Sequence, residues 1–209
     1  MPYLTEFLTV VTVHLLAVMS PGPDFMMVTR NTLIYSRRAG IYSSLGLGLG
    51  IGVHIAYSLL GIGLIISKSI LLFNIMKYVG AAYLFYIGYQ SLVAKASHLH
   101  LAGKGKKKDM EKLEAVKIGF ITNVTNPKAT LFFLALFTQV ISPTTPILVQ
   151  LLYGIEMMVA TALWFIIVSY IFSHHVIKSR FERVQLAAER VMGIVLIGLG
   201  IKLALSSLK

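Results

Sequence analysis

A proline-rich break near the end of the first long apolar run constrains this chain more than any other feature. The run begins at Tyr3, and Pro21, Gly22, Pro23 and Asp24 stand near its end. A proline removes a backbone donor and clashes with the carbonyl one turn back, and lipid cannot satisfy the polar groups that are left unpaired. Within a membrane such a break is tolerated only where it faces protein or a watery cavity. The sequence therefore predicts a cavity at this point.

The composition is that of an integral membrane protein. The 209 residues are 56% hydrophobic and 13% charged, with a mean hydropathy of +0.79, which is too apolar for a soluble globule. The net charge of +11 comes from basic residues between apolar runs, as in the loops of membrane proteins, so nucleic acid is not an expected partner. The absence of cysteine excludes disulfides and thiolate metal sites.

Six apolar runs reach the length of about 20 residues that a membrane-spanning helix needs. We expect the spans near 4–28, 40–66, 70–93, 118–141, 147–172 and 187–207. Most of the 19 lysines and arginines fall in the first, third and fifth connections. Because basic loops remain in the cytoplasm, these connections are predicted to be cytoplasmic, with both termini outside.

The only long connection, at 94–116, separates two halves of three spans each, 4–93 and 117–209. Its lysine-rich run, 103–108, is expected to lie near anionic lipid headgroups. Because each half has an odd number of spans, the second half must be inverted relative to the first. That is the plan of many secondary transporters. The sequence thus predicts one all-α transporter domain, 1–209, of six transmembrane helices in two inverted three-helix repeats.

The two halves carry corresponding helix breakers. Pro23-Asp24 in the first half matches Pro127-Lys128 in the second, so helices 1 and 4 are predicted to be broken. Pro23 suits the first position of a restarted helix, and Asn126 is a good N-cap for another helix that starts at Pro127. Such helices begin inside the membrane, at the point where the two halves meet.

A receptor for a zwitterion follows from these two breaks. Two helix N-termini together with Lys128 suit a carboxylate, and Asp24 offers a place for an ammonium group. A structural ion pair between Asp24 and Lys128 is the open alternative. The sequence therefore predicts an amino acid site whose candidate residues are Pro21, Gly22, Pro23, Asp24, Asn123, Asn126, Pro127 and Lys128.

Three further titratable residues lie near mid-depth of the expected spans, namely His14, His54 and Glu156. A group that changes its protonation as its exposure changes can couple transport to a proton gradient. Glu156 is the leading candidate for that role. For His14 and His54, an imidazole that only bonds a neighbouring helix is an equally open interpretation.

Alternate glycines in the second expected span, at positions 46, 48, 50 and 52, give two overlapping spacings of small residues. Such glycines allow helix backbones to approach closely. We expect them to pack against a neighbouring span of the same chain rather than to form a dimer interface. The sequence leaves a homodimer open.

Several motifs together resemble one known family. They are Ser20 to Phe25, Arg37 to Gly40, Gly46 to His54, Val79 to Leu84 with Gly88, and Thr122-Asn123 with Asn126 to Ala129. From Phe7 to Leu205 the chain is similar to the LysE/RhtB family of bacterial lysine exporters and homoserine/threonine efflux carriers. The resemblance implies export of amino acids across the inner membrane, in exchange for protons, with the threonine exporters closest in look. Glu156 is not part of the family motif.

The leading hypothesis is a proton-coupled exporter of threonine, homoserine or other small neutral amino acids. An exporter of basic amino acids such as lysine and arginine, or of divalent metal cations, is the alternative. Against a metal stand the lack of cysteine and the scatter of the histidines. The sequence contains no protease or hydrolase motif, so we expect no enzyme activity, no cofactor and no bound metal.

Overall fold

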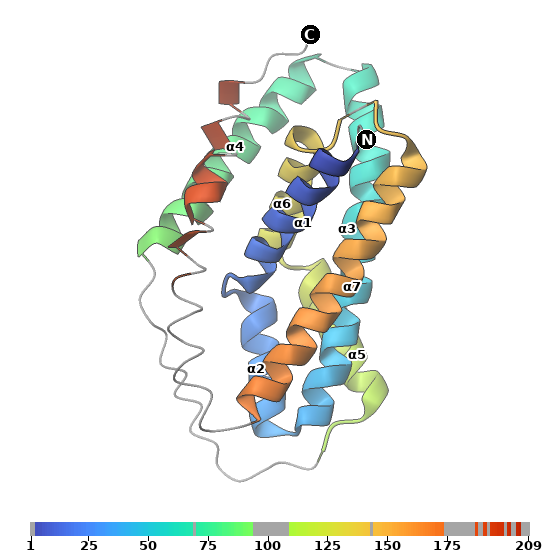
Figure 1. Ribbon diagram of the computed structural model, residues 1–209, viewed down its shortest axis with the longest axis vertical. Coiled ribbons are helices and arrows are strands. Elements are labelled where there is room, and N and C mark those ends of the chain that lie inside the picture. The colour runs from blue at the N-terminus through green and yellow to red at the C-terminus, as the bar shows by residue number, and fades with distance from the viewer. Residues whose placement is uncertain are drawn as a thin grey trace.

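The described part of the chain is built from helices. The computed structural model describes residues 3–68, 70–93, 109–142 and 144–173, and then 187, 190–191, 193–198, 200–201 and 204–205. The helices are α1 (Leu4–Met19), α2 (Pro23–Ile34), α3 (Arg37–Lys68), α4 (Ile70–Val93), α5 (Lys112–Val124), α6 (Pro127–Gln139) and α7 (Ile147–Phe172). Figure 1 shows them as an elongated bundle. The predicted all-α class is confirmed for these residues.

Some of the helices are long and apolar enough to cross a membrane. Among the described residues these are Arg37–Leu60 of α3 and Ile147–Phe172, which is α7. The pair α1 and α2 passes the same test as one broken span with a bend of 54°, and α6 is a shorter apolar helix. The helices are thus those of a membrane protein, while six spans in inverted repeats remain a prediction.

The long connection is shorter than the sequence indicated. We expected it at 94–116, but α5 already begins at Lys112. Glu111 is extended at the helix start, and Glu114 lies in the first turn, where a carboxylate interacts favourably with the helix dipole. The first turns of α5, from Lys112 onward, are too polar to appear in the sequence as part of an apolar run. The lysine-rich run 103–108 lies outside the described residues.

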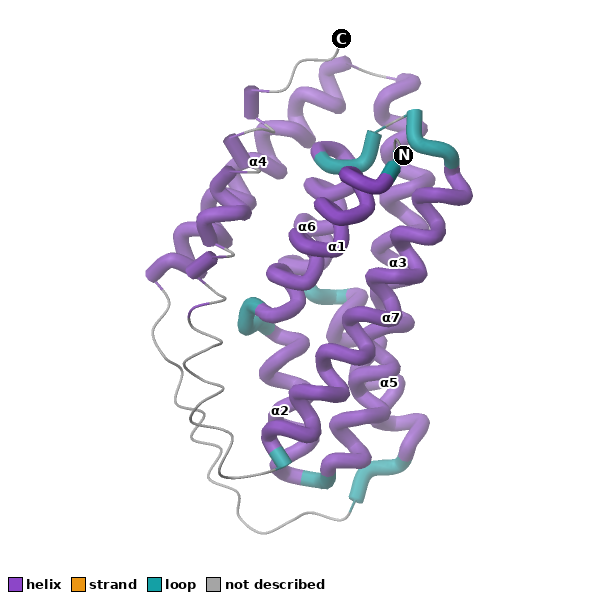
Figure 2. The backbone as a smooth tube through the Cα atoms, in the orientation of Figure 1, coloured by secondary structure: helices purple, strands orange, loops and turns teal. Residues whose placement is uncertain are grey.

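Both predicted helix breaks are confirmed. α1 ends at Met19 and α2 restarts at Pro23, after an extended Gly22. α5 ends at Val124, and the side chain of Asn126 caps α6 by accepting a hydrogen bond from the backbone of Lys128 at 3.0 Å. Figure 2 shows both breaks as short loops at mid-height. From there α2 and α6 run towards opposite ends of the molecule (Figure 1).

Helix α3 packs against α2, α5, α6 and α7. Its alternate glycines face two different neighbours. A Cβ atom at Gly46 would collide with the Val116 carbonyl of α5, and one at Gly50 would lie 2.7 Å from Asn123 Oδ1. A Cβ atom at Gly48 or Gly52 would instead meet α7. The predicted close packing within the chain is therefore confirmed, with one pair of glycines for each neighbouring helix.

The buried apolar side chains form two clusters. The first cluster includes Val10, Val13, Ile51, Ile55, Phe132, Phe133, Leu136, Tyr153 and Met157. The second cluster comprises Phe25, Val28, Leu47, Phe165, Val168 and Phe172. Along α1 and α2, and again along α7, the members of one cluster precede those of the other. The first break therefore lies between two apolar layers.

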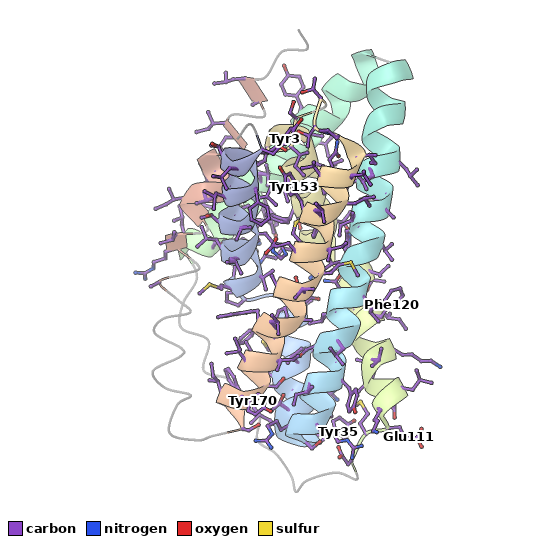
Figure 3. All side chains as sticks on the ribbon, turned by 45° about the vertical axis from the view of Figure 1, so that its right-hand side comes forward. Tyr3, Tyr35, Glu111, Phe120, Tyr153 and Tyr170 are labelled. Carbon is purple, nitrogen blue, oxygen red and sulfur yellow. The ribbon has the colours of Figure 1, made fainter. Side chains whose placement is uncertain are left out.

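Polar contacts fasten the end of the bundle at which α1 begins. The Tyr153 hydroxyl donates to the Tyr3 carbonyl at 3.2 Å, and both rings are labelled in Figure 3. The Glu6 carboxylate accepts from the backbone N–H of Ser142 at 3.0 Å and from the Thr145 hydroxyl at 2.9 Å. The turn between α6 and α7 is thereby held against the start of α1.

The opposite end is fastened differently. Tyr35 and Glu111, labelled in Figure 3, mark this end, where α2 gives way to α3 and α5 begins. The Ser36 hydroxyl donates to Asp109 Oδ1 at 2.7 Å and also accepts from the backbone N–H of Ala39. Asp109 therefore ties the segment before α5 to the turn between α2 and α3.

Candidate functional site

A cavity of about 50 Å³ lies where the two broken helices meet. Its polar lining comes from α1, α2, α5, α6 and α7, from both breaks, and comprises His14, Ser20, Asp24, Asn123, Asn126, Lys128 and Thr161. Its apolar lining comes from both clusters and includes Phe25, Ile51, Phe132, Phe133 and Phe165. The cavity is thus a polar chamber between two apolar layers. The cavity expected from the proline-rich break is present.

Asp24 lies in the first turn of α2, where the helix dipole favours a carboxylate. Its Oδ2 accepts a hydrogen bond from Asn123 Nδ2 at 2.8 Å. Its Oδ1 is buried and has no hydrogen-bond partner among the described residues. Asn126 and Lys128 line the same cavity as this carboxyl group. A buried carboxylate oxygen of this kind can accept a hydrogen bond from a positively charged donor.

Lys128 extends from the first turn of α6 to the first break. Its ammonium group donates to Ser20 O at 3.0 Å, to Ser20 Oγ at 2.8 Å and to Pro21 O at 3.1 Å. An ammonium group has three protons, and these three contacts use them all. Gly22 lies beneath the lysine stem, since a Cβ atom there would be 3.4 Å from Lys128 Cδ. Lys128 therefore fastens the two breaks together.

The three prolines of the predicted site act through the backbone. Pro23 and Pro127 are exposed at the first positions of α2 and α6, outside the lining of the cavity. Pro21 contributes its carbonyl oxygen to Lys128. Together they place Asp24 and Lys128 at helix starts, and these two residues face the cavity.

His54 is fully buried and connects to the cavity through Asn123. Its Nε2 lies 3.0 Å from the Asn123 carbonyl oxygen, and its Nδ1 lies 2.6 Å from the Tyr57 hydroxyl. That hydroxyl in turn lies 3.3 Å from the Thr130 carbonyl oxygen. The imidazole ring stacks on Phe133, with the ring centroids 5.4 Å apart. Asn123 is thus the residue that joins His54 to Asp24.

The other two titratable candidates differ in position. His14 lines the cavity, and its Nε2 lies 3.2 Å from the Thr161 hydroxyl. Glu156 is half-buried on α7 and does not line the cavity. Within the described residues its Oε2 has no hydrogen-bond partner. Of the three candidates, His14 lines the cavity, His54 contacts the cavity residue Asn123, and Glu156 lies outside the cavity lining.

Comparison with known proteins identifies the family of this chain. The family model of the LysE type translocators matches residues 15–207. The chain belongs to this family. The family resemblance drawn from the sequence motifs is thereby confirmed.

Two of the following three relatives of this LysE type translocator align with nearly its whole length. It is 32% identical to the uncharacterized membrane protein YrhP of Bacillus subtilis (strain 168), over 96% of this chain and 99% of the relative. It is 30% identical to the threonine efflux protein of Escherichia coli (strain K12), over 96% and 98%. It is 35% identical to the homoserine/homoserine lactone efflux protein of Salmonella typhimurium, over 64% of each chain. No solved structure matches it.

Two polar residues of this LysE type translocator's cavity were missed as site residues by sequence reasoning. Ser20 provides two of the three acceptors for Lys128, and its place beside Pro21 was the signal that could have identified it. Thr161 lies in the largely apolar α7 and belongs to no motif. No sequence signal distinguishes it from the other polar residues of that helix.

Proposed function

We propose that this LysE type translocator exports small neutral amino acids, threonine and homoserine among them, from the cytoplasm by proton antiport. Relatives that cover most of its length are named for the efflux of these two amino acids. The observation that carries the proposal is the unpartnered Asp24 Oδ1 in the same chamber as the Lys128 ammonium. This arrangement holds opposite charges a short distance apart, as a zwitterion requires.

Each half of the zwitterion has its own receptor in this proposal. The substrate ammonium donates to Asp24 Oδ1, while Asn123 continues to hold Oδ2. The substrate carboxylate accepts a hydrogen bond from the Lys128 ammonium. It thereby replaces the Ser20 hydroxyl as one of the acceptors of Lys128. Binding therefore satisfies a buried carboxylate without leaving the lysine unpaired. The contacts that hold the first break change at the same time.

The size of the chamber favours a small substrate. Since one water molecule needs roughly 10–15 Å³ of such volume, about 50 Å³ is room for a few water molecules. The rings of Phe132, Phe133 and Phe165 bound this space. A long basic side chain would require these rings to move, whereas a side chain of one to three heavy atoms requires little change.

The apolar layers on both sides of the chamber support alternating access. The first cluster separates the chamber from the end where α1 begins, and the second separates it from the opposite end. In this proposal, one layer opens while the other stays closed. Pairing of the Asp24 carboxylate with the substrate ammonium lowers the barrier to that exchange, because an unsatisfied buried carboxylate oxygen is unfavourable in an apolar region.

Basic residues support the orientation of the bundle. Arg37 begins α3 and its guanidinium lies 4.8 Å from the Tyr170 ring centroid, while the Lys112 ammonium, at the start of α5, lies 5.7 Å from that of Tyr42. Both lie at the end opposite the start of α1. By the positive-inside rule this end lies on the cytoplasmic side of the inner membrane. Substrate then enters through the second cluster.

His54 is the proposed proton carrier. A carbonyl oxygen only accepts, so the contact with Asn123 requires a proton on Nε2. Tyr57 has one proton for two neighbours, Nδ1 of His54 and the Thr130 carbonyl. If Nδ1 also carries a proton, all three contacts become hydrogen bonds at once. The site therefore accommodates one additional proton without rearrangement, next to the residue that holds Asp24.

Uptake of labelled amino acids into inside-out vesicles tests the proposal. We expect threonine, homoserine and alanine to accumulate more when a proton gradient is imposed, and lysine to accumulate little. In Asp24→Asn, uptake should fall by roughly 10- to 100-fold, because a hydrogen bond to a charged group contributes about 1.5–3 kcal/mol. Unchanged uptake by this variant would refute the role of Asp24.

The proton carrier is tested by separating exchange from net transport. Exchange of labelled for unlabelled threonine moves no net proton, whereas uptake driven by a gradient does. We expect His54→Gln to retain exchange within about threefold and to lose gradient-driven accumulation. The same measurement on Glu156→Gln should leave both unchanged. A reversed pattern would assign coupling to Glu156 instead.

A further inference from the structure

A polar pair lies at the otherwise apolar end of the chamber. His14 and Thr161 face each other across α1 and α7, with Nε2 of the imidazole 3.2 Å from the Thr161 hydroxyl. Both side chains are 1% exposed, and both line the cavity. The aromatic rings of Phe132 and Phe133 lie beside the imidazole, with centroids 6.3 and 6.2 Å from it. The pair is thus a small polar group within an apolar wall.

One atom of this pair is unsatisfied. His14 Nδ1 is buried and has no hydrogen-bond partner among the residues that the structure describes. If Thr161 donates to Nε2, then Nδ1 carries a proton that lacks an acceptor. If Nε2 donates to Thr161, then Nδ1 is an acceptor that lacks a donor. Either tautomer leaves one hydrogen bond of His14, a residue that lines the cavity, still to be made.

We propose that His14 and Thr161 form a subsite for the side-chain hydroxyl of the transported amino acid. This inference rests on the proposed amino acid export, and it specifies the substrate class. A hydroxyl is both a donor and an acceptor, so it satisfies Nδ1 in either tautomer. A methyl group in the same place leaves Nδ1 unpaired in an apolar wall, which is unfavourable.

The position of the pair fits a side chain rather than the substrate's charged groups. The charged residues that line the described cavity are Asp24 and Lys128, both at the breaks. His14 lies six residues before Ser20 on α1, about 9 Å along the helix axis. A substrate held by its ammonium and carboxylate at the breaks therefore directs its side chain towards His14 and Thr161. A charged side chain would find no opposite charge there among the described lining residues.

Threonine and valine are the test substrates, because they have nearly the same shape and differ in one hydroxyl. Purified full-length protein in proteoliposomes should transport threonine at least about tenfold more efficiently than valine, since a site built to bond a hydroxyl rejects its apolar analogue. Thr161→Val and His14→Phe should both bring this ratio close to one. They should do so by lowering threonine transport more than valine or alanine transport.

Thr12→Val is the matched control. Thr12 also lies on α1, is exposed, and bonds the Leu8 carbonyl of its own helix. This variant should keep the wild-type ratio. If His14→Phe fails to fold, the isosteric Thr161→Val decides the question alone.

Three results would overturn the subsite. They are equal transport of threonine and valine by the wild type, an unchanged ratio in Thr161→Val, and an equal loss for all substrates in His14→Phe. The last result would assign His14 a general role such as proton transfer. The proposed export function fails separately, if the wild type transports no amino acid at all.

Discussion

At the residue scale, the proposed site makes Ser20 a competitor of the substrate carboxylate for Lys128. The Ser20 hydroxyl occupies one ammonium proton, and the Ser20 and Pro21 carbonyls occupy the other two. Ser20→Ala removes the hydroxyl and leaves both carbonyls. We expect the KM for threonine in vesicle uptake to fall by roughly tenfold or more, because a hydrogen bond to a charged group contributes about 1.5–3 kcal/mol. Lys128→Gln should raise the KM by more than that.

The control for Ser20→Ala is Thr125→Ala in the second break. The Thr125 hydroxyl bonds the Ile121 carbonyl of its own helix and is exposed, so its loss should not change the KM. A higher KM in Ser20→Ala would show that this hydroxyl binds the substrate carboxylate itself. Lys128 would then serve only to fasten the breaks.

The residues that were predictable are those whose chemistry is local. Pro23 and Pro127 fix helix starts, so Asp24 and Lys128 had to lie in first turns, wherever those helices packed. Thr161 was not predictable, because its place in the cavity depends on the rotation of α7 against α1. That rotation is set by side-chain packing between segments more than a hundred residues apart, and no spacing within α7 reports it.

At the element scale, the position of Asn123 depends on the absence of a side chain at Gly50. A Cβ atom there would lie 2.7 Å from Asn123 Oδ1 and 2.8 Å from its Cβ. Gly50→Ala should therefore displace Asn123, weaken its bond to Asp24 and reduce threonine uptake by roughly tenfold or more, as overpacking costs about 1–3 kcal/mol. Uptake at equal amounts of protein in the membrane is the measurement.

Gly52→Ala is the comparison on the same helix. Its Cβ atom would meet Met158 Cε at 3.3 Å, which is the flexible end of a side chain that can move aside. Uptake should stay near that of the wild type. An equal loss of uptake in Gly50→Ala and Gly52→Ala would mean that α3 tolerates no added methyl group. The loss in Gly50→Ala could then not be attributed to Asn123.

A second prediction concerns the contact between α1 and the turn before α7. Glu6 holds that turn through Ser142 and Thr145. Glu6→Ala should lower the unfolding temperature in detergent by several degrees, because a charged hydrogen bond contributes about 1.5–3 kcal/mol. Glu111→Ala is the control, since that exposed side chain makes no capping hydrogen bond. An equal change of the unfolding temperature in both variants would contradict a stabilising role for the contacts of Glu6 with the turn before α7.

For the whole molecule, the sequence specified where helices break but not how the bundle closes around them. The corresponding prolines predicted two interrupted helices, and α2 and α6 do begin at mid-height and run in opposite directions (Figure 2). The start of α5 at Lys112 was missed because its polar turns resemble a loop. The two apolar layers were also missed, since each combines side chains from several helices and only their packing brings them together.

Alternating access makes a prediction about these two layers together. Met157 lies in the first cluster and Val168 in the second, both on α7, on either side of Thr161 and Phe165. The chain has no native cysteine, so Met157→Cys and Val168→Cys each introduce a single thiol. If the layers open in turn, saturating threonine should increase the reactivity of one thiol towards a water-soluble maleimide and decrease that of the other.

Leu163→Cys is the control for this labelling, because Leu163 is 55% exposed on the same helix and belongs to neither layer. Its reactivity should not depend on threonine. A rise at both Met157→Cys and Val168→Cys would indicate general loosening of the bundle, and no change at either would mean that the layers do not act as barriers. A further outcome is that the reactivities of the two thiols change in opposite directions and that these changes reverse when the proton gradient is reversed. That result would show that substrate and proton act on one equilibrium between two states. A ligand shifts such an equilibrium only through its different affinity for each state.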